Sequence, residues 1–204
     1  MKTLLLLTLS LLSTAAFAHH PMGGDAPQTV FHGLLSGLAH PVIGIDHLAF
    51  VVLVGLAAAF AGRSLLAPMA FIGATLLGTG LLLAGVVLPL VEAVVVASVL
   101  LLGALLVFGR RVAGPLAMVG FAAAGVFHGW AYGEAVIGAT PMPIFAYLLG
   151  FGITQFLIAG GIATFAGRLL QQGQGQLQAR MAAAVCLGVG LVYAAEGLEQ
   201  LLLV

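Results

Sequence analysis

Long apolar stretches, rarely interrupted by charge, are the feature that most limits what this chain can fold into. Six of them, separated by charged residues or by proline and glycine, are long enough to cross the roughly 30 Å hydrocarbon core of a bilayer. They lie at about 41–60, 65–88, 90–109, 112–132, 143–166 and 181–202. A soluble domain normally carries about 25% charged residues, whereas this chain carries 6%. The sequence therefore predicts an all-α membrane protein whose six transmembrane helices form one domain, residues 41–204.

The first residues have the pattern of a secretory signal. Lys2 gives a positive start, residues 4–12 form an apolar core, and Ala16-Phe17-Ala18 is the small-x-small pattern that signal peptidase recognises. Because this core is too short to span hydrocarbon comfortably, we expect residues 1–18 to be a cleavable signal peptide. Residues 19–40 are then expected to form an exported segment with a short re-entrant or interfacial helix.

The arginines test the predicted spans independently, because cytoplasmic loops hold an excess of positive charge. The six spans place all five on one side: Arg63, Arg110, Arg111, Arg168 and Arg180. The other side has no lysine or arginine once the signal is removed. We therefore expect an integral protein of the bacterial inner membrane, with the N- and C-termini outside the cytoplasm.

Charge and cysteine content exclude several other functions. Six basic and six acidic residues cancel, so nothing supports a basic face for nucleic acid. Cys186 is the single cysteine, so neither a disulfide nor a thiolate metal cluster can form within one chain. The expected partners are the lipid bilayer and a small ligand, and the sequence leaves open whether the chain forms an oligomer.

Nearly all other ionisable side chains fall in the outward half of this arrangement. They are His19, His20, Asp25, His32, His40, Asp46, His47, Glu92, His128, Glu134, Glu196 and Glu199. Ionisable residues inside a membrane are costly and by default mark a substrate path. Imidazoles with a carboxylate suit a divalent cation such as nickel, cobalt, zinc or copper(II). The alternative is that histidines only form hydrogen bonds between packed helices.

The first predicted span carries the densest group of donors. His40 precedes Pro41, which suits the first turn of a helix, so we expect the span to begin there. His47 would then lie two turns deeper on nearly the same face as His40. Asp46, about 100° round the helix from His47, is placed to reach a neighbouring helix or to orient another histidine.

Further candidate donors lie on later spans and at the new N-terminus. His128 is near the outer end of the fourth span, and Glu134 beyond it could be a ligand, a funnel charge or a helix-end residue. Gln155 lies in mid-span and could coordinate through its amide oxygen or bond to a neighbour. Cleavage after residue 18 would expose His19 and His20, whose nitrogens with the α-amine could chelate a late transition metal. Alternatively, this terminus is only a frayed polar tail.

These residues together resemble the HupE/UreJ family of nickel/cobalt permeases. The likeness covers essentially the whole chain and rests on an exported start leading to histidines, on six spans and on two motifs. The motifs are His40-Pro41-x-x-Gly44-x-Asp46-His47 and Phe127-His128-Gly129-x-Ala131-x-Gly133. The resemblance implies that His40, Asp46, His47 and His128 handle metal, and that Glu134 is the acidic residue closing the second motif.

The function that this resemblance implies is transport rather than catalysis. A permease without a prosthetic group would take up Ni²⁺ and/or Co²⁺, the divalent cation being its substrate. Two other classes also fit the residues: a metal- or haem-binding membrane enzyme or redox subunit, and a non-transporting assembly partner whose histidines only hold helices together. A haem absorption band would favour the enzyme, and stoichiometric metal binding lost in His47→Ala would count against the assembly partner.

Overall fold

The chain is described by a computed structural model over residues 25–62 and 65–203. Over these ranges the fold is helical and contains no strand. The helices are α2 (Val30–Ile43), α3 (Ile45–Phe60), α4 (Leu66–Leu83), α5 (Val91–Val107), α6 (Pro115–Gly133), the short 3-10 helix η2 (Glu134–Val136), α7 (Pro141–Gln171) and α8 (Gln176–Leu203). The predicted signal peptide lies outside the described residues. His19 and His20, which follow it, lie outside them as well.

The described helices confirm the all-α class and bear out part of the predicted span count. Helices α4, α7 and α8, and α6 together with η2, are each long and apolar enough to cross a membrane. The bent pair α2 and α3 adds a fifth span if it is counted as one, whereas α5 is apolar but 17 residues long. The described residues thus show four to five helices of spanning length, and six spans stays a prediction.

The expected start of the first span at Pro41 is wrong. Helix α2 continues through Pro41 to Ile43 and is capped by Gly44, whose ψ of 96° leaves the helical range although its N–H still bonds to the His40 carbonyl. Helix α3 starts again at once, at an angle of 77° to α2. His40 and His47 therefore lie on two differently directed helices and cannot share one helical face. The sequence shows Pro41 but not the tertiary contacts that extend α2 past it.

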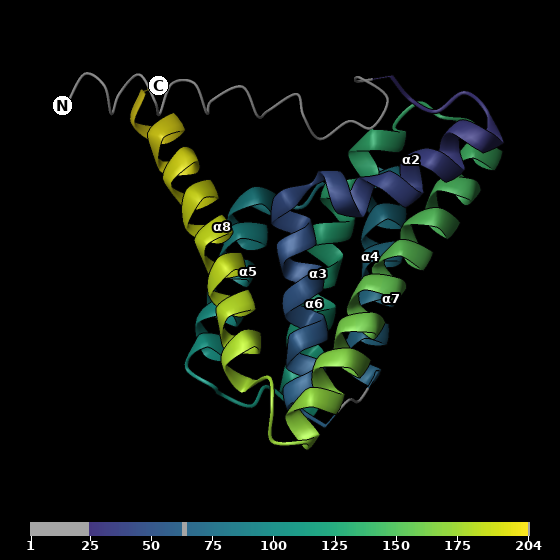
Figure 1. The fold of residues 1–204 in the computed structure, drawn as a ribbon. Coiled ribbons are helices and arrows are strands. Elements are labelled where there is room, and N and C mark those ends of the chain that lie inside the picture. Colours follow the sequence, from purple (N-terminus) through teal and green to yellow (C-terminus); the bar gives the residue numbers. More distant parts are fainter. Residues whose placement is uncertain (1–24, 63–64, 204) are drawn as a thin grey trace.

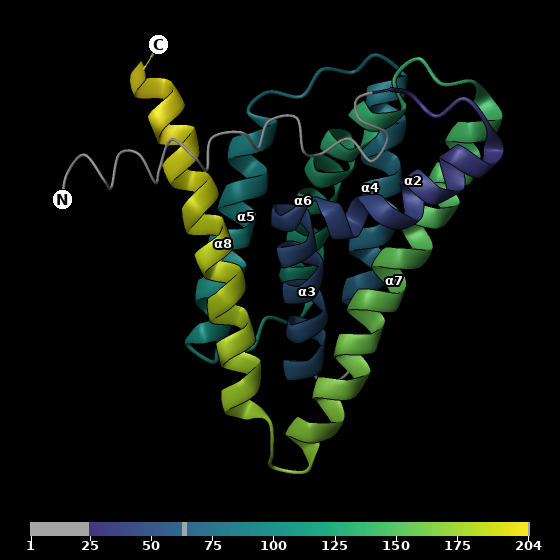
Figure 2. The same ribbon diagram turned by 45° about the horizontal axis from the view of Figure 1, so that its top comes forward.

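The helices associate as close pairs around α3. Helix α4 packs along α6, α2 along α7, and α5 along α8, while α3 contacts members of all three pairs. Figures 1 and 2 show α2 lying across one end of the bundle, and α7 and α8 diverging toward that end from the loop that joins them. The described arginines lie at the opposite end, in or beside the loops that follow α5 and α7.

Small residues explain how closely two of these pairs approach. A Cβ atom on Gly129 of α6 would overlap the backbone carbonyl of Thr75 on α4. A Cβ atom on Gly37 of α2 would overlap the carbonyl of Tyr147 on α7 in the same way. Membrane helices use such residues to bring backbones together, because lipid provides no hydrophobic force between helices. The two pairs are consequently tight units.

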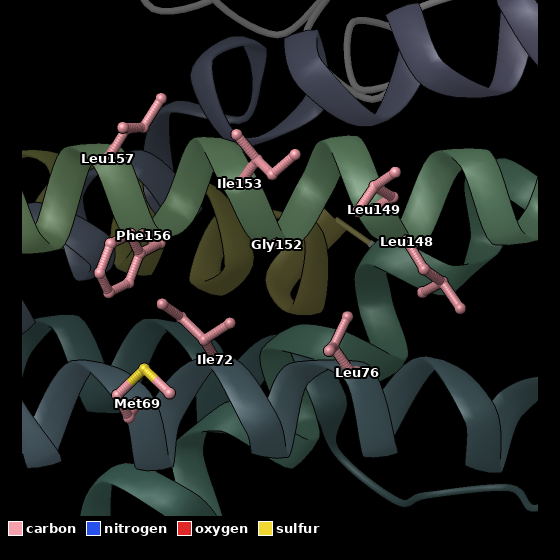
Figure 3. Close-up of a pocket in the computed structure, with 9 residues that line it drawn as sticks. All are labelled: Met69, Ile72, Leu76, Leu148, Leu149, Gly152, Ile153, Phe156 and Leu157. Atoms are coloured by element: carbon pink, nitrogen blue, oxygen red, sulfur yellow. The ribbon is translucent and has the colours of Figure 1, made fainter.

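The outer surface of the bundle is apolar. Leu116, Phe145, Leu157 and Leu202 are each more than 60% exposed, as expected of side chains that face lipid. A groove of about 540 Å³ runs over this surface between α4 and α7. Figure 3 shows its lining of aliphatic side chains, Met69 and Phe156, without an ionisable group. The chemistry of the protein must be sought inside the bundle.

Candidate metal site

The four predicted donors within the described spans are all buried at the end of the bundle that α2 covers. His40, Asp46, His47 and His128 are exposed by 4%, 8%, 7% and 0% of their surfaces. Three helices supply them, since His40 lies on α2, Asp46 and His47 on the first turn of α3, and His128 on α6. None of these four side chains faces the lipid side.

Asp46, His47 and His128 form one continuous polar chain that ends on Ser98 of α5. The Asp46 Oδ2 and His47 Nε2 atoms are 3.8 Å apart. His47 Nδ1 lies 2.9 Å from His128 Nδ1, and His128 Nε2 lies 2.9 Å from Ser98 Oγ. Three helices thus contribute to a single row of donors and acceptors that ends at Ser98.

The proton positions in this row follow from its far end. The Ser98 hydroxyl also lies 2.6 Å from the Val95 carbonyl, which can only accept, so the hydroxyl donates there and His128 Nε2–H donates to Ser98. His128 Nδ1 must then accept a hydrogen bond from His47 Nδ1–H. A neutral His47 consequently has its lone pair on Nε2, the atom 3.8 Å from Asp46 Oδ2.

That end of the row has the chemistry of a cation site. The other carboxylate oxygen, Asp46 Oδ1, is buried and has no hydrogen-bond partner among the described residues. Two donors bound to one transition metal at about 2.1 Å each are about 3 to 4 Å apart, which includes the observed distance between Asp46 Oδ2 and His47 Nε2. A neutral imidazole nitrogen close to a carboxylate oxygen is a ligand pair that suits a divalent metal.

His40 belongs to a separate hydrogen-bonded group. Its Nδ1 is 2.7 Å from the hydroxyl of Tyr147, and that hydroxyl donates to the Tyr132 carbonyl at 2.9 Å. Since the hydroxyl has a single proton, His40 Nδ1–H must donate to Tyr147. A neutral His40 therefore has its lone pair on Nε2, as in metal sites where an outer partner fixes the histidine tautomer.

Aromatic rings surround both groups. The ring of Tyr132 contacts the rings of both His40 and His47, and its own hydroxyl is buried without a hydrogen-bond partner in the described part of the chain. Phe50 stacks on the His128 imidazole with ring centroids 4.5 Å apart, and Phe71 meets the same imidazole edge-on. Such apolar walls exclude water and strengthen electrostatic interactions inside the site.

The structure brings some predicted ligands together and separates others. Over residues 25–62 and 65–203, no three histidine, cysteine or carboxylate side chains already form a group that would hold a metal ion. Glu134 is exposed and caps the C-terminal end of α6, outside the buried group. The predicted ligands His19 and His20 are not among the described residues. The donors as they stand therefore require some rearrangement around a cation.

Sequence reasoning missed two residues that hold the histidines. Ser98 is a lone hydroxyl within the aliphatic α5, and a polar residue at such a position is a signal that could have been used. Tyr147 resembles an ordinary interfacial aromatic until its contact with His40 is seen. Gln155 does bond to a neighbour, through Nε2 to Thr75 Oγ1, while its Oε1 is buried without a partner in the described ranges.

Apolar helices around buried histidines and a carboxylate define an integral membrane protein with a polar centre inside its helix bundle. The chain belongs to the family described as HupE / UreJ protein, which matches residues 7–193. It is similar to Protein HupE of Rhizobium leguminosarum bv. viciae, with 29% identity over 189 residues that cover 81% of this chain and 96% of the relative. No solved structure matches the chain.

Proposed function

We propose that this protein is a permease that takes up Ni²⁺ and/or Co²⁺ through its buried histidine and carboxylate groups. Membership of a family associated with nickel and cobalt transport supports this proposal. The observation that carries it is the facing pair of Asp46 Oδ2 and His47 Nε2 inside an otherwise apolar bundle. Burying a carboxylate there is costly, and a visiting cation would offset that cost.

The path begins on the side opposite the arginines. Cytoplasmic loops attract positive charge, so we place the arginine end inside the cell and the histidines toward the outer compartment. His19, His20 and the exposed Glu134 would gather the cation before it reaches the buried donors. The sequence has no nucleotide-binding motif, so a gradient or trapping of the metal inside would drive uptake.

Binding requires a small change at the histidine pair. His47 Nδ1 and His128 Nδ1 share a hydrogen bond at 2.9 Å. In this arrangement the His47 Nδ1 proton occupies the lone pair of His128 Nδ1. Rotation of the His128 ring would break this hydrogen bond and let His128 Nδ1 turn toward a cation held by Asp46 Oδ2 and His47 Nε2.

The proposal is tested by uptake of radiolabelled nickel and cobalt in cells that carry wild type, Asp46→Asn or His47→Ala at equal expression. We expect both variants to lose most of the uptake, because Asp46→Asn removes the negative charge that balances the cation and His47→Ala removes the imidazole ligand. Glu92→Gln and His32→Ala are matched controls, since these side chains lie outside the buried group and should leave uptake unchanged. Equal accumulation with Asp46→Asn, His47→Ala and wild type would defeat the assignment.

A further inference from the structure

The predicted ligands form two groups that do not share one space. His40 is held on α2 by Tyr147, whereas Asp46, His47 and His128 form a row between α3 and α6. The break at Gly44 causes this division, because it turns α3 by 77° away from α2. We call His40 the outer station and the row Asp46–His47–His128 the inner station.

The ring of Tyr132 contacts both stations. Its centroid is 4.8 Å from that of His40, in an edge-on contact, and 4.1 Å from that of His47. On another side it packs edge-on against Phe151 at 4.4 Å. Tyr132 is fully buried. A cation that moves from the outer to the inner station therefore meets this ring.

The backbone that carries Tyr132 cannot easily move aside. One turn earlier on α6, Gly129 packs directly on the backbone of Thr75. The Tyr132 carbonyl itself accepts the hydrogen bond from Tyr147, which ties α6 to α7. Close-packed interiors resist displacement of whole helices, so the way past Tyr132 must open through rotation of its side chain.

The side chain is free of the bond that would oppose this rotation. The Tyr132 hydroxyl has no hydrogen-bond partner among the described residues. A buried tyrosine hydroxyl usually finds one, and breaking such a bond would add to the barrier. Rotation of the ring therefore costs ring contacts but no hydrogen bond.

We propose that Tyr132 is the residue that sets the rate at which a divalent cation passes from His40 to the Asp46–His47–His128 station. This proposal rests on the proposed function and adds to it an order of events and a rate-controlling side chain. The ring acts on the transfer between stations, so its removal changes how fast the inner station fills. The equilibrium affinity of the inner station depends on its own ligands and stays as it was.

The test is stopped-flow loading of the purified full-length chain with Co²⁺, followed by the visible absorption of histidine-bound cobalt. We expect Tyr132→Ala to fill the inner station about tenfold faster than wild type, which corresponds to a barrier lower by about 1.4 kcal/mol, with unchanged equilibrium affinity. Tyr132→Leu should fall between the two because it keeps part of the bulk. His40→Ala should load more slowly, again with unchanged final affinity.

Phe145→Ala is the control, because Phe145 is 67% exposed on α7 and lies outside the ring cluster. A thermal melt of each variant identifies a loss of fold, and Tyr132→Leu preserves the test if Tyr132→Ala unfolds. Folded variants that load at the wild-type rate, or that lose equilibrium affinity, would overturn the role of Tyr132 alone. Absence of any Co²⁺ binding to wild type would contradict the proposed function and this proposal with it.

Discussion

At the scale of single residues, the hydroxyl group that bonds to a histidine decides which ring nitrogen keeps its proton. The Ser98 hydroxyl accepts a hydrogen bond from His128 Nε2–H, and the Tyr147 hydroxyl accepts one from His40 Nδ1–H. The two histidines therefore use different nitrogens in the neutral state. The sequence shows where a histidine is, but not which of its ring nitrogens is protonated. That depends on a hydrogen-bond partner from another helix.

Tyr147→Phe tests this dependence. The change removes the acceptor for His40 Nδ1–H and the donor to the Tyr132 carbonyl, so His40 loses its fixed tautomer and orientation. Loss of such outer partners typically weakens metal affinity by about 10- to 100-fold. We expect a higher KM for nickel uptake in Tyr147→Phe, with a smaller effect on the maximal rate.

The control for this prediction is Thr154→Val. Thr154 Oγ1 donates to the Leu38 carbonyl and so joins the same two helices, α7 and α2, without touching His40. It should lose a comparable fraction of stability and keep the wild-type KM. If both variants shifted KM equally, Tyr147 would have only a structural role.

At the scale of helices, close backbone contact positions the site. The row from Asp46 to Ser98 needs α3, α5 and α6 at fixed separations. Helix α6 is placed by its glycine contact with α4, and the Thr79 hydroxyl donates across that interface to the Gly129 carbonyl at 2.7 Å. The same motif that carries His128 thus also carries the residue that fixes its helix.

Gly129→Ala should therefore destabilise the protein. The added Cβ would overlap the Thr75 carbonyl, and backbone cannot yield as a flexible side chain can. Overpacking of this kind costs about 1–3 kcal/mol, which thermal unfolding in detergent would detect. On the same helix, a Cβ at Gly120 meets no atom within 4 Å, so Gly120→Ala should unfold at or above the wild-type temperature. A wild-type melting temperature for Gly129→Ala would contradict the tight α4–α6 interface.

At the scale of the whole molecule, charge and donors are segregated to opposite ends. The described arginines lie in or beside the loops after α5 and α7, while the buried histidines lie near the end covered by α2. This polarity agrees with the bias of arginine toward cytoplasmic loops. It gives the proposed path a direction, from the histidines toward the arginine end.

Labelling of single cysteines tests the direction. In a Cys186→Ala background, Thr140→Cys places a thiol before α7 at the histidine end, and Gln174→Cys places one in the loop between α7 and α8. A membrane-impermeant maleimide should label Thr140→Cys in intact spheroplasts and Gln174→Cys only after lysis. The reverse pattern would show that the protein is oriented with its histidine end inside the cell.

The sequence by itself determined that this is an apolar, helical chain and where most of its helices lie. These properties are local, because the length of an apolar stretch and its punctuation are read from neighbouring residues. The motif residues Asp46, His47 and His128 are also recognisable from the sequence alone, since ionisable groups are conspicuous in apolar helices. Their direct contact follows only from the fold.

The tertiary structure alone decided how those residues are divided and supported. The bend at Gly44 separates His40 from His47, and the pairing of α2 with α7 carries α2 past Pro41. Partners such as Ser98 and Tyr147 are 30 and 107 residues away from their histidines. No local pattern encodes such contacts, because they depend on how helices far apart in the chain pack against one another.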